Sequence, residues 1–286
     1  MYATVNTLRE RQQMSVHILN GYTVIPYKSF KFSGGEIQVK LAPANMEYSA
    51  DKPVVFHATI TSADDLMELA LVVDAVKRFF NQPIKTQLYL PYMPYARQDR
   101  VCAKGEALSL RVAATFINSL EFDKVTVVDP HSDVTPALLN NCSVTDIVEI
   151  FATRMHHFAP IGNTVLVSPD AGAIKKVLKL AQFLKLRMIQ AEKIRNPMDG
   201  EITGTKVHTD HLGLKPVLVV DDICDGGRTF TELAKELSHK TDGKLNLYVT
   251  HGIFSKGLEP LLEWYDKIYC PYVFPGVEQN EKLVRI

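Results

Sequence analysis

The sequence predicts an α/β protein of two domains, each with a mainly parallel sheet flanked by helices. At about 150 residues per domain, a chain of 286 residues corresponds to two domains. From about residue 53 onward, short β-rich runs alternate with amphipathic stretches whose apolar residues recur at the helical period. The alternation continues through both halves of the chain and is typical of right-handed, parallel βαβ units.

The first half contains strand–helix–strand patterns after a region of short extended runs. Residues 53–60 (PVVFHATI) predict a strand, and Ser62 is placed to cap the helix that follows, with Asp64 and Asp65 favourable in its first turn. One face of this helix is apolar, formed by Leu66, Leu69, Ala70, Val73 and Val76. The other elements expected here are a strand at 86–90, a helix at 106–120, a strand at 124–128, and extended runs at 16–19 and 30–40.

The second half repeats the pattern. Strands are expected at 164–167, 187–190, 216–220, 246–250 and 267–269, and helices at 173–183, 229–239 and 256–264. A boundary near residue 145 gives each half one α/β unit, so we expect domains over residues 1–145 and 146–286. Because ligands bind at the carboxyl ends of strands in such sheets, the polar segments that follow the strands are the candidate sites.

Composition narrows the classes of function. Apolar residues make up 46% of the chain and charged residues 22%, as in ordinary globular proteins. The 32 Lys and Arg residues equal the 32 Asp and Glu residues, so no global basic field predicts nucleic-acid binding. The four cysteines are far apart, the N-terminus lacks an apolar core, and no run approaches the ~18 apolar residues of a membrane span. We therefore expect a soluble, cytoplasmic protein that binds neither nucleic acid nor membrane.

The strongest functional signal is the segment 217–230, VLVVDDICDGGRTF. We expect a buried apolar strand that ends at Asp221 and Asp222, followed by residues 225–229 (DGGRT) and a helix. Adjacent glycines can turn backbone N–H groups inward, and a helix N-terminus adds partial positive charge, so this turn predicts a phosphate cradle. The two carboxylates can hold ribose hydroxyls or a magnesium ion. The alternative is a plain strand-to-helix turn with a capping Asp.

Three other strand ends carry polar residues. The run 91–100 (PYMPYARQDR) contains two guanidinium groups that can clamp phosphates. His131, within DPHSD, can ligate a metal through a neutral imidazole nitrogen or cap a turn. Asp170, within LVSPDAG, precedes a small-residue turn into a helix. Single residues of these types are more often structural, but four such strand ends together favour a functional site.

A polar segment without hydrophobic period lies between residues 190 and 207 and contains Lys193 and Arg195. A mobile cationic loop can close over a phosphoryl group and stabilise the charge that develops during its transfer. An exposed hairpin with ordinary surface charges is the alternative, and the spacing does not separate the two.

Taken together, these segments resemble the ribose-phosphate pyrophosphokinases, which are the synthetases of phosphoribosyl diphosphate (PRPP). PYARQDR, DPHSD, VSPDAG, VVDDICDGGRT and THGIF occur in the order found in that family, and residues 32–36 (FSGGE) are similar to its FSDGE segment. The resemblance covers residues 30–255. It implies two phosphoribosyltransferase-like α/β domains and a magnesium-dependent transfer of the β,γ-diphosphate of ATP to the 1-hydroxyl of ribose 5-phosphate.

The resemblance also implies roles for individual residues. ATP would be bound by Phe32, Glu36, Arg97, Gln98, Asp99 and Arg100, with Phe32 and Glu36 completing the adenine pocket of a neighbouring subunit in a homodimer or hexamer. Mg²⁺ would be held with the help of His131 and Asp170. Lys193 and Arg195 would stabilise the transferring group. The acceptor would be bound by Asp221 and Asp222 through its ribose hydroxyls and by Asp225, Gly226, Gly227, Arg228 and Thr229 through its 5-phosphate.

Several departures from the family pattern bear on the acceptor and on regulation. DGGRT stands where the family usually has D-T-x-G-T, and Gly34 replaces the Asp of FSDGE. The segment VCAKGEAL lacks the family's basic KxRSRE run, so its familiar allosteric control is not expected. The catalytic loop is shortened, and CPYVFPG lacks the C-terminal N/D-S-I-P signature.

The altered phosphate loop keeps a second acceptor open. A Gly-Gly turn with an added Arg could also bind a 5-linked diphosphate instead of a terminal phosphate. ADP-ribose carries such a diphosphate, and phage-type relatives use it in NAD salvage. A phosphoribosyltransferase would share the DGGRT loop but would not need PYARQDR. A non-catalytic regulatory relative would be expected to lose the loop cations or the magnesium residues, all of which are present here.

Overall fold

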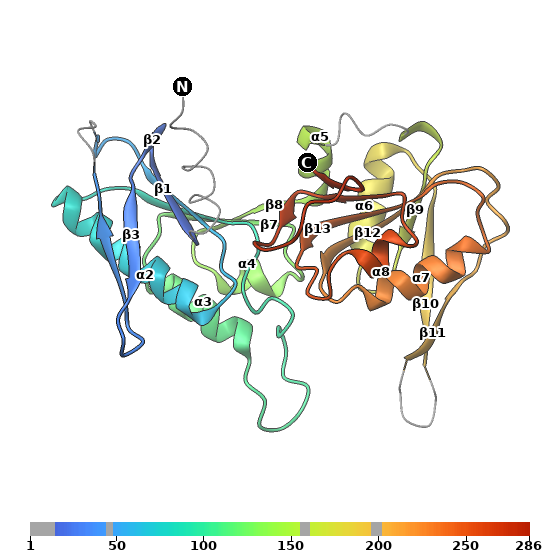
Figure 1. Cartoon of the computed structure of the whole chain (residues 1–286), viewed down its shortest axis with the longest axis horizontal. Helices are drawn as coiled ribbons and strands as arrows, with labels where there is room; N and C mark the ends of the chain where they lie inside the picture. The colour runs from blue at the N-terminus through green and yellow to red at the C-terminus, as the bar shows by residue number, and fades with distance from the viewer. Residues whose placement is uncertain (1–14, 44–47, 155–160, 196–201) are drawn as a thin grey trace. The chain divides into compact units, whose positions relative to one another are not determined.

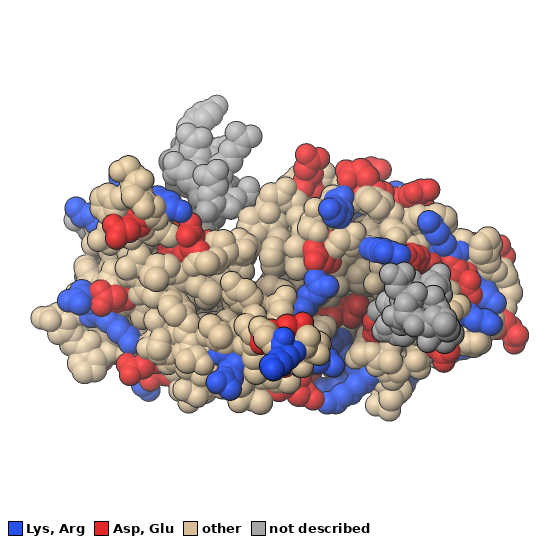
Figure 2. Space-filling view, turned by 90° about the horizontal axis from the view of Figure 1, so that it is seen from below, with Lys and Arg blue, Asp and Glu red and all other residues tan. Residues whose placement is uncertain are grey.

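The chain divides into two compact units, Met1–Thr145 and Asp146–Ile286, each with its own sheet and apolar core (Figure 1). The computed structural model describes residues 15–43, 48–154, 161–195 and 202–286. The predicted α/β architecture is confirmed, since both sheets contain a run of parallel strands and alternate with helices along the chain. Every helix in these described ranges is too short or too polar to cross a membrane. On the face shown in Figure 2, basic and acidic side chains are interspersed over the described atoms.

The sheet of the first unit is parallel except at its β1 end. In sheet order its strands are β2 (Thr23–Val24), β1 (Val16–Asn20), β5 (Val54–Ala58), β6 (Thr86–Leu90), β7 (Lys124–Val128) and β8 (Cys142–Thr145). β1 is antiparallel to β2 and β5, whereas β5, β6, β7 and β8 are parallel neighbours in that order. The carboxyl ends of β6 and β7 therefore lie side by side, and the polar segments that follow them start at one edge of the sheet.

The helices of the first unit are α2 (Ala63–Phe80), α3 (Ser109–Asn118) and α4 (Val134–Leu138). Ser62 caps α2 as predicted, because its hydroxyl accepts the N–H of Asp65 and the Asp65 carboxylate accepts the N–H of Ser62. The helix expected over 106–120 is shorter than predicted. The Glu106 carboxylate accepts the N–H groups of Cys102 and Ala103, so this residue closes the preceding turn instead of starting the helix.

The extended run expected at 30–40 is an antiparallel hairpin of β3 (Tyr27–Lys31) and β4 (Ile37–Leu41). Glu68 of α2 fastens it, since its carboxylate accepts hydrogen bonds from the Tyr27 hydroxyl at 2.6 Å and from the Ser29 hydroxyl at 2.7 Å. An ion pair between Lys31 and Asp64 at 2.7 Å adds a second attachment to α2. The hairpin that carries the FSGGE turn is thus held in a defined position on this helix.

The sheet of the second unit has eight strands. In sheet order they are β11 (Ile202–Val207), β10 (Met188–Arg195), β9 (Val165–Ser168), β12 (Val217–Cys224), β13 (Leu245–Gly252), β14 (Lys267–Cys270) and β16 (Leu283–Arg285), while β15 (Tyr272–Val273) pairs with β13. All pairs are parallel except β10 with β11. β10 lies on one side of β9 and β12 on the other, so the chain order reverses between β9 and β12. Such a switch point opens a crevice at the carboxyl ends of the two strands.

The helices of the second unit are α5 (Ile147–Arg154), α6 (Ile174–Leu184), α7 (Arg228–Ser238) and α8 (Glu259–Leu262). α7 is amphipathic and buries Phe230, Leu233, Ala234 and Leu237 in the core. β13 is buried at every position, as expected of a central parallel strand covered on both faces. The helix expected over 256–264 is shorter, because Gly257 has a φ of +76° and cannot belong to it.

Two predictions about strand ends are wrong. The strand expected at 216–220 continues to Cys224, so Asp221 and Asp222 lie within β12 instead of beyond it, and their strand stays in register with β13. The strand expected at 187–190 continues to Arg195 and pairs with β11. Lys193 and Arg195 therefore lie on one arm of a hairpin and not in an irregular loop, while residues 196–201 at its turn lie outside the described ranges.

Candidate active site

Two adjacent carboxylates lie in β12, toward the carboxyl edge of the second sheet. Asp222 is 5% exposed and Asp221 is half-buried, and Asp221 Oδ1 accepts the N–H of Asp222 at 2.9 Å. Lys176 of α6 supplies a positive charge, with its Nζ 3.7 Å from Asp222 Oδ2. Burial and the neighbouring carboxylate raise the pKa of Asp221 well above its ordinary value, and the Lys176 charge opposes this rise. This arrangement offers acceptors for hydroxyl groups of a ligand at the strand end.

The turn after β12, residues 225–229, leads directly into α7. Asp225 fixes it to the loop after β13, because Asp225 Oδ1 accepts the Ser255 hydroxyl at 2.6 Å and the Asp225 carbonyl accepts the Ser255 N–H at 3.1 Å. α7 begins at Arg228 with Gly227 as its N-cap, so the turn lies at a helix N-terminus. The N–H groups and the dipole at such an end attract anions. We refer to residues 225–229 as the phosphate turn.

Arg228 adds a cation to the phosphate turn, and its side chain is 82% exposed. Its Nε donates to Glu232 Oε1, one helical turn further along α7, at 2.7 Å. The guanidinium group thus lies along the outer surface of the helix, next to the turn.

The two glycines of the phosphate turn are not equivalent. Gly227 has a φ of +78°, and a Cβ there would lie 3.3 Å from Leu261 Cδ2. Gly226 is outside that left-handed region, and a Cβ there would meet Lys256 Cγ at 3.5 Å, an ordinary contact. Gly227→Ala is therefore expected to lower the free energy of unfolding by about 1–2 kcal/mol, with a smaller effect for Gly226→Ala. Thermal unfolding of the two variants checks this, and equal effects would contradict it.

Asp170 follows β9, on the other side of the switch point. Its Oδ1 accepts the N–H groups of Gly172 at 2.9 Å and Ala173 at 3.3 Å, and its carbonyl accepts the Ser168 hydroxyl at 2.8 Å. These bonds shape the turn that leads into α6. Asp170 thus has the structural role of a turn-forming carboxylate, and it lies at the same sheet edge as the phosphate turn.

In the first unit, the segments after β6 and β7 meet through Asp99. This side chain is buried, and burial by itself would raise its pKa. Hydrogen bonds from Ser132 and Arg100 outweigh this effect, together with the charges of Arg100 and His131. The pKa of Asp99 is therefore below the ordinary value. The Arg100 Nε lies 3.1 Å from Asp99 Oδ1. Asp99 therefore braces the two segments against each other.

The other predicted ATP-binding residues of this run are exposed. Arg97, Gln98 and Arg100 reach solvent around the buried Asp99. Two nearby residues hold the left-handed backbone conformation, Tyr95 with a φ of +61° and Asp129 with a φ of +41°. Strained non-glycine residues of this kind cluster at functional sites, and here they lie at the carboxyl ends of two neighbouring parallel strands.

Phe32 and Glu36 lie at the turn between β3 and β4. The Phe32 N–H donates to the Glu36 carbonyl at 2.8 Å, and Gly35 has a φ of +95°, which closes the turn. The Phe32 ring is 52% exposed and contacts Phe30 edge-on, with ring centroids 5.1 Å apart. The turn thus presents an aromatic side chain to its surroundings.

Lys193 and Arg195 lie on β10, opposite Thr205 and Ile202 of β11, with a register shift next to Arg195. The arm formed by β10 and β11 extends away from the rest of the second sheet (Figure 1). Beyond Gln190 the described part of β10 pairs with β11 alone, and this hairpin geometry is compatible with the closing motion predicted for the segment.

Sequence reasoning missed three residues that shape these sites: Ser132, Lys176 and Ser255. Ser132 belongs to the motif DPHSD, and Ser255 directly follows THGIF. Nothing in the spacing shows that each hydroxyl bonds a carboxylate of a neighbouring segment. Lys176 sits in an ordinary amphipathic helix. Only the packing of α6 against β12 reveals its role.

The described residues contain no cluster of three or more His, Cys, Asp or Glu side chains placed to hold a metal ion. Mg²⁺ does not require such a cage, since it is usually held by one or two carboxylates together with waters and substrate phosphates. The acidic residues at the strand ends are compatible with that mode of binding.

Comparisons with known proteins point to one family. Residues 5–120 match the N-terminal domain of ribose phosphate pyrophosphokinase. The chain is 31% identical over 253 residues to a ribose-phosphate pyrophosphokinase of Pyrococcus furiosus, covering 86% of this chain and 85% of that protein. It is 30% identical to another from Mycoplasma pneumoniae, covering 79% and 67%. A crystal structure of phosphoribosylpyrophosphate synthetase from Mycobacterium smegmatis has the same fold, with a TM-score of 0.76 and 22% identity over 92% of this chain and 86% of that one.

Proposed function

The chain belongs to the ribose-phosphate pyrophosphokinase family, and we propose that it transfers the β,γ-diphosphate of ATP to the 1-hydroxyl of ribose 5-phosphate. The observation that carries this proposal is the pair Asp221–Asp222 followed by a glycine turn at the N-terminus of α7. Carboxylates suit the hydroxyls of a ribose, and the turn suits its phosphate. The enzyme is thus a diphosphotransferase.

In the proposed reaction, the 1-hydroxyl oxygen of the acceptor attacks the β-phosphorus of ATP. The bond between that phosphorus and the oxygen bridging the α- and β-phosphates breaks, AMP leaves with the bridging oxygen, and the hydroxyl proton is released. The products are PRPP, AMP and one proton. Such a transfer needs alignment and fixed positive charge more than covalent help from the protein.

We assign the acceptor to the second unit. Asp221 and Asp222 would accept hydrogen bonds from the ribose hydroxyls, and the nearby Lys176 charge would favour the charged form of this pair. The 5-phosphate would bind to backbone N–H groups of the phosphate turn, formed by Asp225, Gly226, Gly227, Arg228 and Thr229. The residues for the ribose hydroxyls lie on β12 and those for the 5-phosphate lie on the turn that follows it. This continuity fixes the distance between the two binding positions.

We assign ATP to the first unit. The exposed guanidinium groups of Arg97 and Arg100 would bind its phosphates, Gln98 would contact the base or ribose, and Asp99 would hold the run in place. Phe32 and Glu36 would contact adenine in a neighbouring subunit, which makes the enzyme a homodimer or a larger homo-oligomer. The exposure of the Phe32 ring supports this assignment.

Mg²⁺ would accompany ATP and neutralise the charge on its phosphates. Asp170 offers a carboxylate for it. His131 would act through a metal-bound water or a phosphate, because Mg²⁺ prefers oxygen ligands. All four cysteines are free thiols, which fits the reducing cytoplasm in which we place the enzyme.

The test is a product assay with ATP, Mg²⁺ and ribose 5-phosphate, analysed by mass spectrometry. We expect AMP and PRPP in equal amounts. Release of ADP, or no AMP in the presence of ribose 5-phosphate, would contradict the proposed reaction. A reaction that needs an added nucleobase and PRPP would instead indicate a phosphoribosyltransferase.

A further inference from the structure

The loop that follows β13 is fastened to the phosphate turn by hydrogen bonds. The N–H groups of Ile253 and Phe254 donate to the Cys224 carbonyl, at 2.8 and 3.1 Å. Ser255 donates its N–H to the Asp225 carbonyl and its hydroxyl to the Asp225 carboxylate. The loop and the turn therefore hold a fixed position relative to each other.

This loop carries Lys256 at a short exposed bend. Phe254 and Leu258, on either side of the bend, are each 4% exposed and belong to the apolar core of the second unit. The residues between them, Ser255, Lys256 and Gly257, are exposed. Because both ends of the bend are anchored, the backbone of Lys256 stays next to the phosphate turn.

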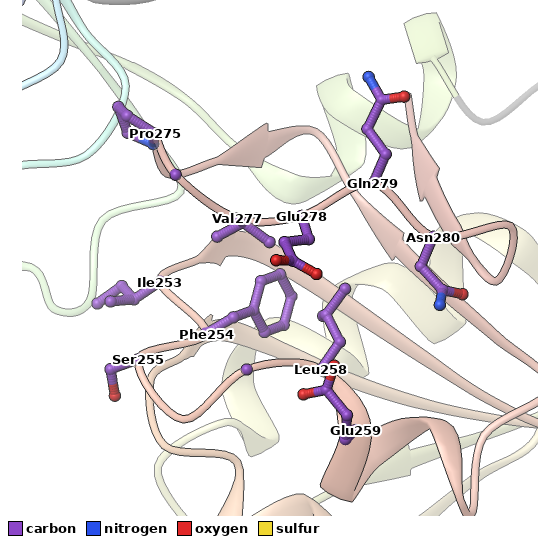
Figure 3. Close-up of a pocket in the computed structure, with 12 residues that line it drawn as sticks. Ile253, Phe254, Ser255, Leu258, Glu259, Pro275, Val277, Glu278, Gln279 and Asn280 are labelled. Atoms are coloured by element: carbon purple, nitrogen blue, oxygen red, sulfur yellow. The ribbon is translucent and has the colours of Figure 1, made fainter.

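The Lys256 side chain lies on the side of the loop that faces the turn. A Cβ at Gly226 would lie 3.5 Å from Lys256 Cγ, so the stem of this side chain passes directly beside the turn. The other side of the loop is a wall of a cavity of about 480 Å³ (Figure 3). Of residues 253–259, all of which the structure describes, Lys256 alone does not line this cavity. Since the ammonium group ends a flexible stem, it can reach a phosphate that is bound to the turn.

The carboxyl groups around the turn outnumber the cations that pair with them. Four carboxyl groups lie on β12, the turn and the first part of α7: Asp221, Asp222, Asp225 and Glu232. Lys176 lies 3.7 Å from Asp222, and Arg228 lies 2.7 Å from Glu232. A ribose phosphate brings more negative charge to this region, which favours a further cation next to the turn.

Gly226 leaves space for this cation. It stands at the position of the threonine in the family's D-T-x-G-T pattern. A Cβ there already contacts Lys256 Cγ, and the branches of a threonine would extend beyond that Cβ. With glycine at this position, the space beside the turn is open to the Lys256 side chain.

We propose that Lys256 binds the 5-phosphate of the acceptor, as a cation that the loop after β13 supplies to the phosphate turn. The turn contributes backbone N–H groups, and Lys256 contributes a full charge and a donor that can follow the phosphate oxygens. Lys256 takes no part in making or breaking bonds, so it stabilises the bound acceptor equally before and during the transfer. This inference rests on the proposed function, because it takes the turn as the site of the 5-phosphate.

The experiment compares Lys256→Met with Lys215→Met in the full chain. Lys215 is exposed and lies just before β12, at the opposite end of that strand from the turn, so its replacement removes the same charge from the same unit. A third variant, Lys256→Arg, keeps the charge on the loop. AMP release with ATP and Mg²⁺ gives kcat and the KM for ribose 5-phosphate. Calorimetry gives the dissociation constant of ribose 5-phosphate in the absence of ATP.

We expect Lys256→Met to raise both the KM and the dissociation constant for ribose 5-phosphate about tenfold, as for the loss of a hydrogen bond to a charged group. Its kcat should stay within about twofold of the wild-type value, because the lost contact is the same in the ground state and the transition state. The KM for ATP should not change. Lys215→Met should match the wild type, and Lys256→Arg should lie closer to the wild type than to Lys256→Met.

The outcomes separate the role of Lys256 from the proposed function. If ribose 5-phosphate is turned over and the two methionine variants have the same KM, or if Lys256→Arg is as impaired as Lys256→Met, the role of Lys256 is wrong and the proposed function stands. If no AMP forms but Lys256→Met alone weakens the binding of ribose 5-phosphate, Lys256 binds the phosphate and the proposed reaction is wrong. If the wild type neither binds nor converts ribose 5-phosphate, both are wrong. A KM that rises selectively in Lys256→Met, with AMP formed by every variant, supports both.

Discussion

Replacing Lys193 with alanine is expected to lower kcat about 10²- to 10³-fold, as for the removal of one group that stabilises charge in a transition state. Lys193 lies on β10, and the family resemblance implies that it stabilises the transferring diphosphate. ATP is assigned to residues of the first unit, so its dissociation constant should stay within about twofold of the wild-type value. AMP formation under saturating substrates and calorimetric titration with ATP provide the two measurements.

The matched control is Lys206→Ala. Lys206 is an exposed residue on β11 of the same arm, opposite Glu192, and it has no assigned role. Its removal changes the charge of the arm by the same amount as Lys193→Ala. Similar losses in the two variants would mean that only the net charge of the arm matters, and an unchanged kcat in Lys193→Ala would remove the assigned role altogether.

The central strands of the first unit were predictable from short β-rich runs whose fully buried residues recur at alternate positions of the strand. The strands expected at 86–90 and 124–128 coincide with β6 and β7, and the cap of α2 at Ser62 has the predicted hydrogen bonds. In such elements the local pattern and the tertiary environment agree. The fold class therefore followed from the sequence.

The polar strands were not predictable in the same way. β10 pairs with β9 only over Met188–Gln190, and beyond that its described residues pair with β11 alone. Fewer apolar residues are required there, so the sequence of residues 190–207 has no strand period. The extension of β12 through Asp221 and Asp222 was missed for a related reason. Two adjacent carboxylates usually end a buried strand, and here the charge of Lys176 stabilises them within it.

The candidate sites were predictable as clusters but not as contacts. Parallel topology brings strand ends to one edge, and this places Asp170 near the phosphate turn and the segment of Asp99 near that of His131. Which atoms then touch depends on packing, as with the Ser255 hydroxyl on Asp225. The cavity beside the turn had no sequence signal, because two segments about twenty residues apart form it.

Lys176→Met is expected to destabilise the protein by about 3–5 kcal/mol at neutral pH, because it leaves the buried Asp222 without its counter-charge. The loss should depend on pH. Burial and Asp222 already raise the pKa of Asp221 in the folded state, and Lys176 opposes this rise. A folded state that binds more protons than the unfolded state loses stability as the pH rises from about 4, the pKa of an unperturbed Asp, through the raised folded value.

Removing Lys176 raises the folded pKa further, so this window extends to higher pH. The difference in free energy of unfolding between Lys176→Met and the wild type should be small near pH 4 and grow toward pH 8, as urea unfolding at several pH values would reveal. The control is Lys175→Met, an exposed neighbour on the same helix. A loss independent of pH, or an equal loss in the control, would contradict the pairing. Protonation of Asp221 also removes a hydrogen-bond acceptor from the ribose site. The KM of Lys176→Met for the acceptor should therefore rise as the pH falls. If Lys176 is purely structural, the variant and the wild type should show the same dependence of KM on pH.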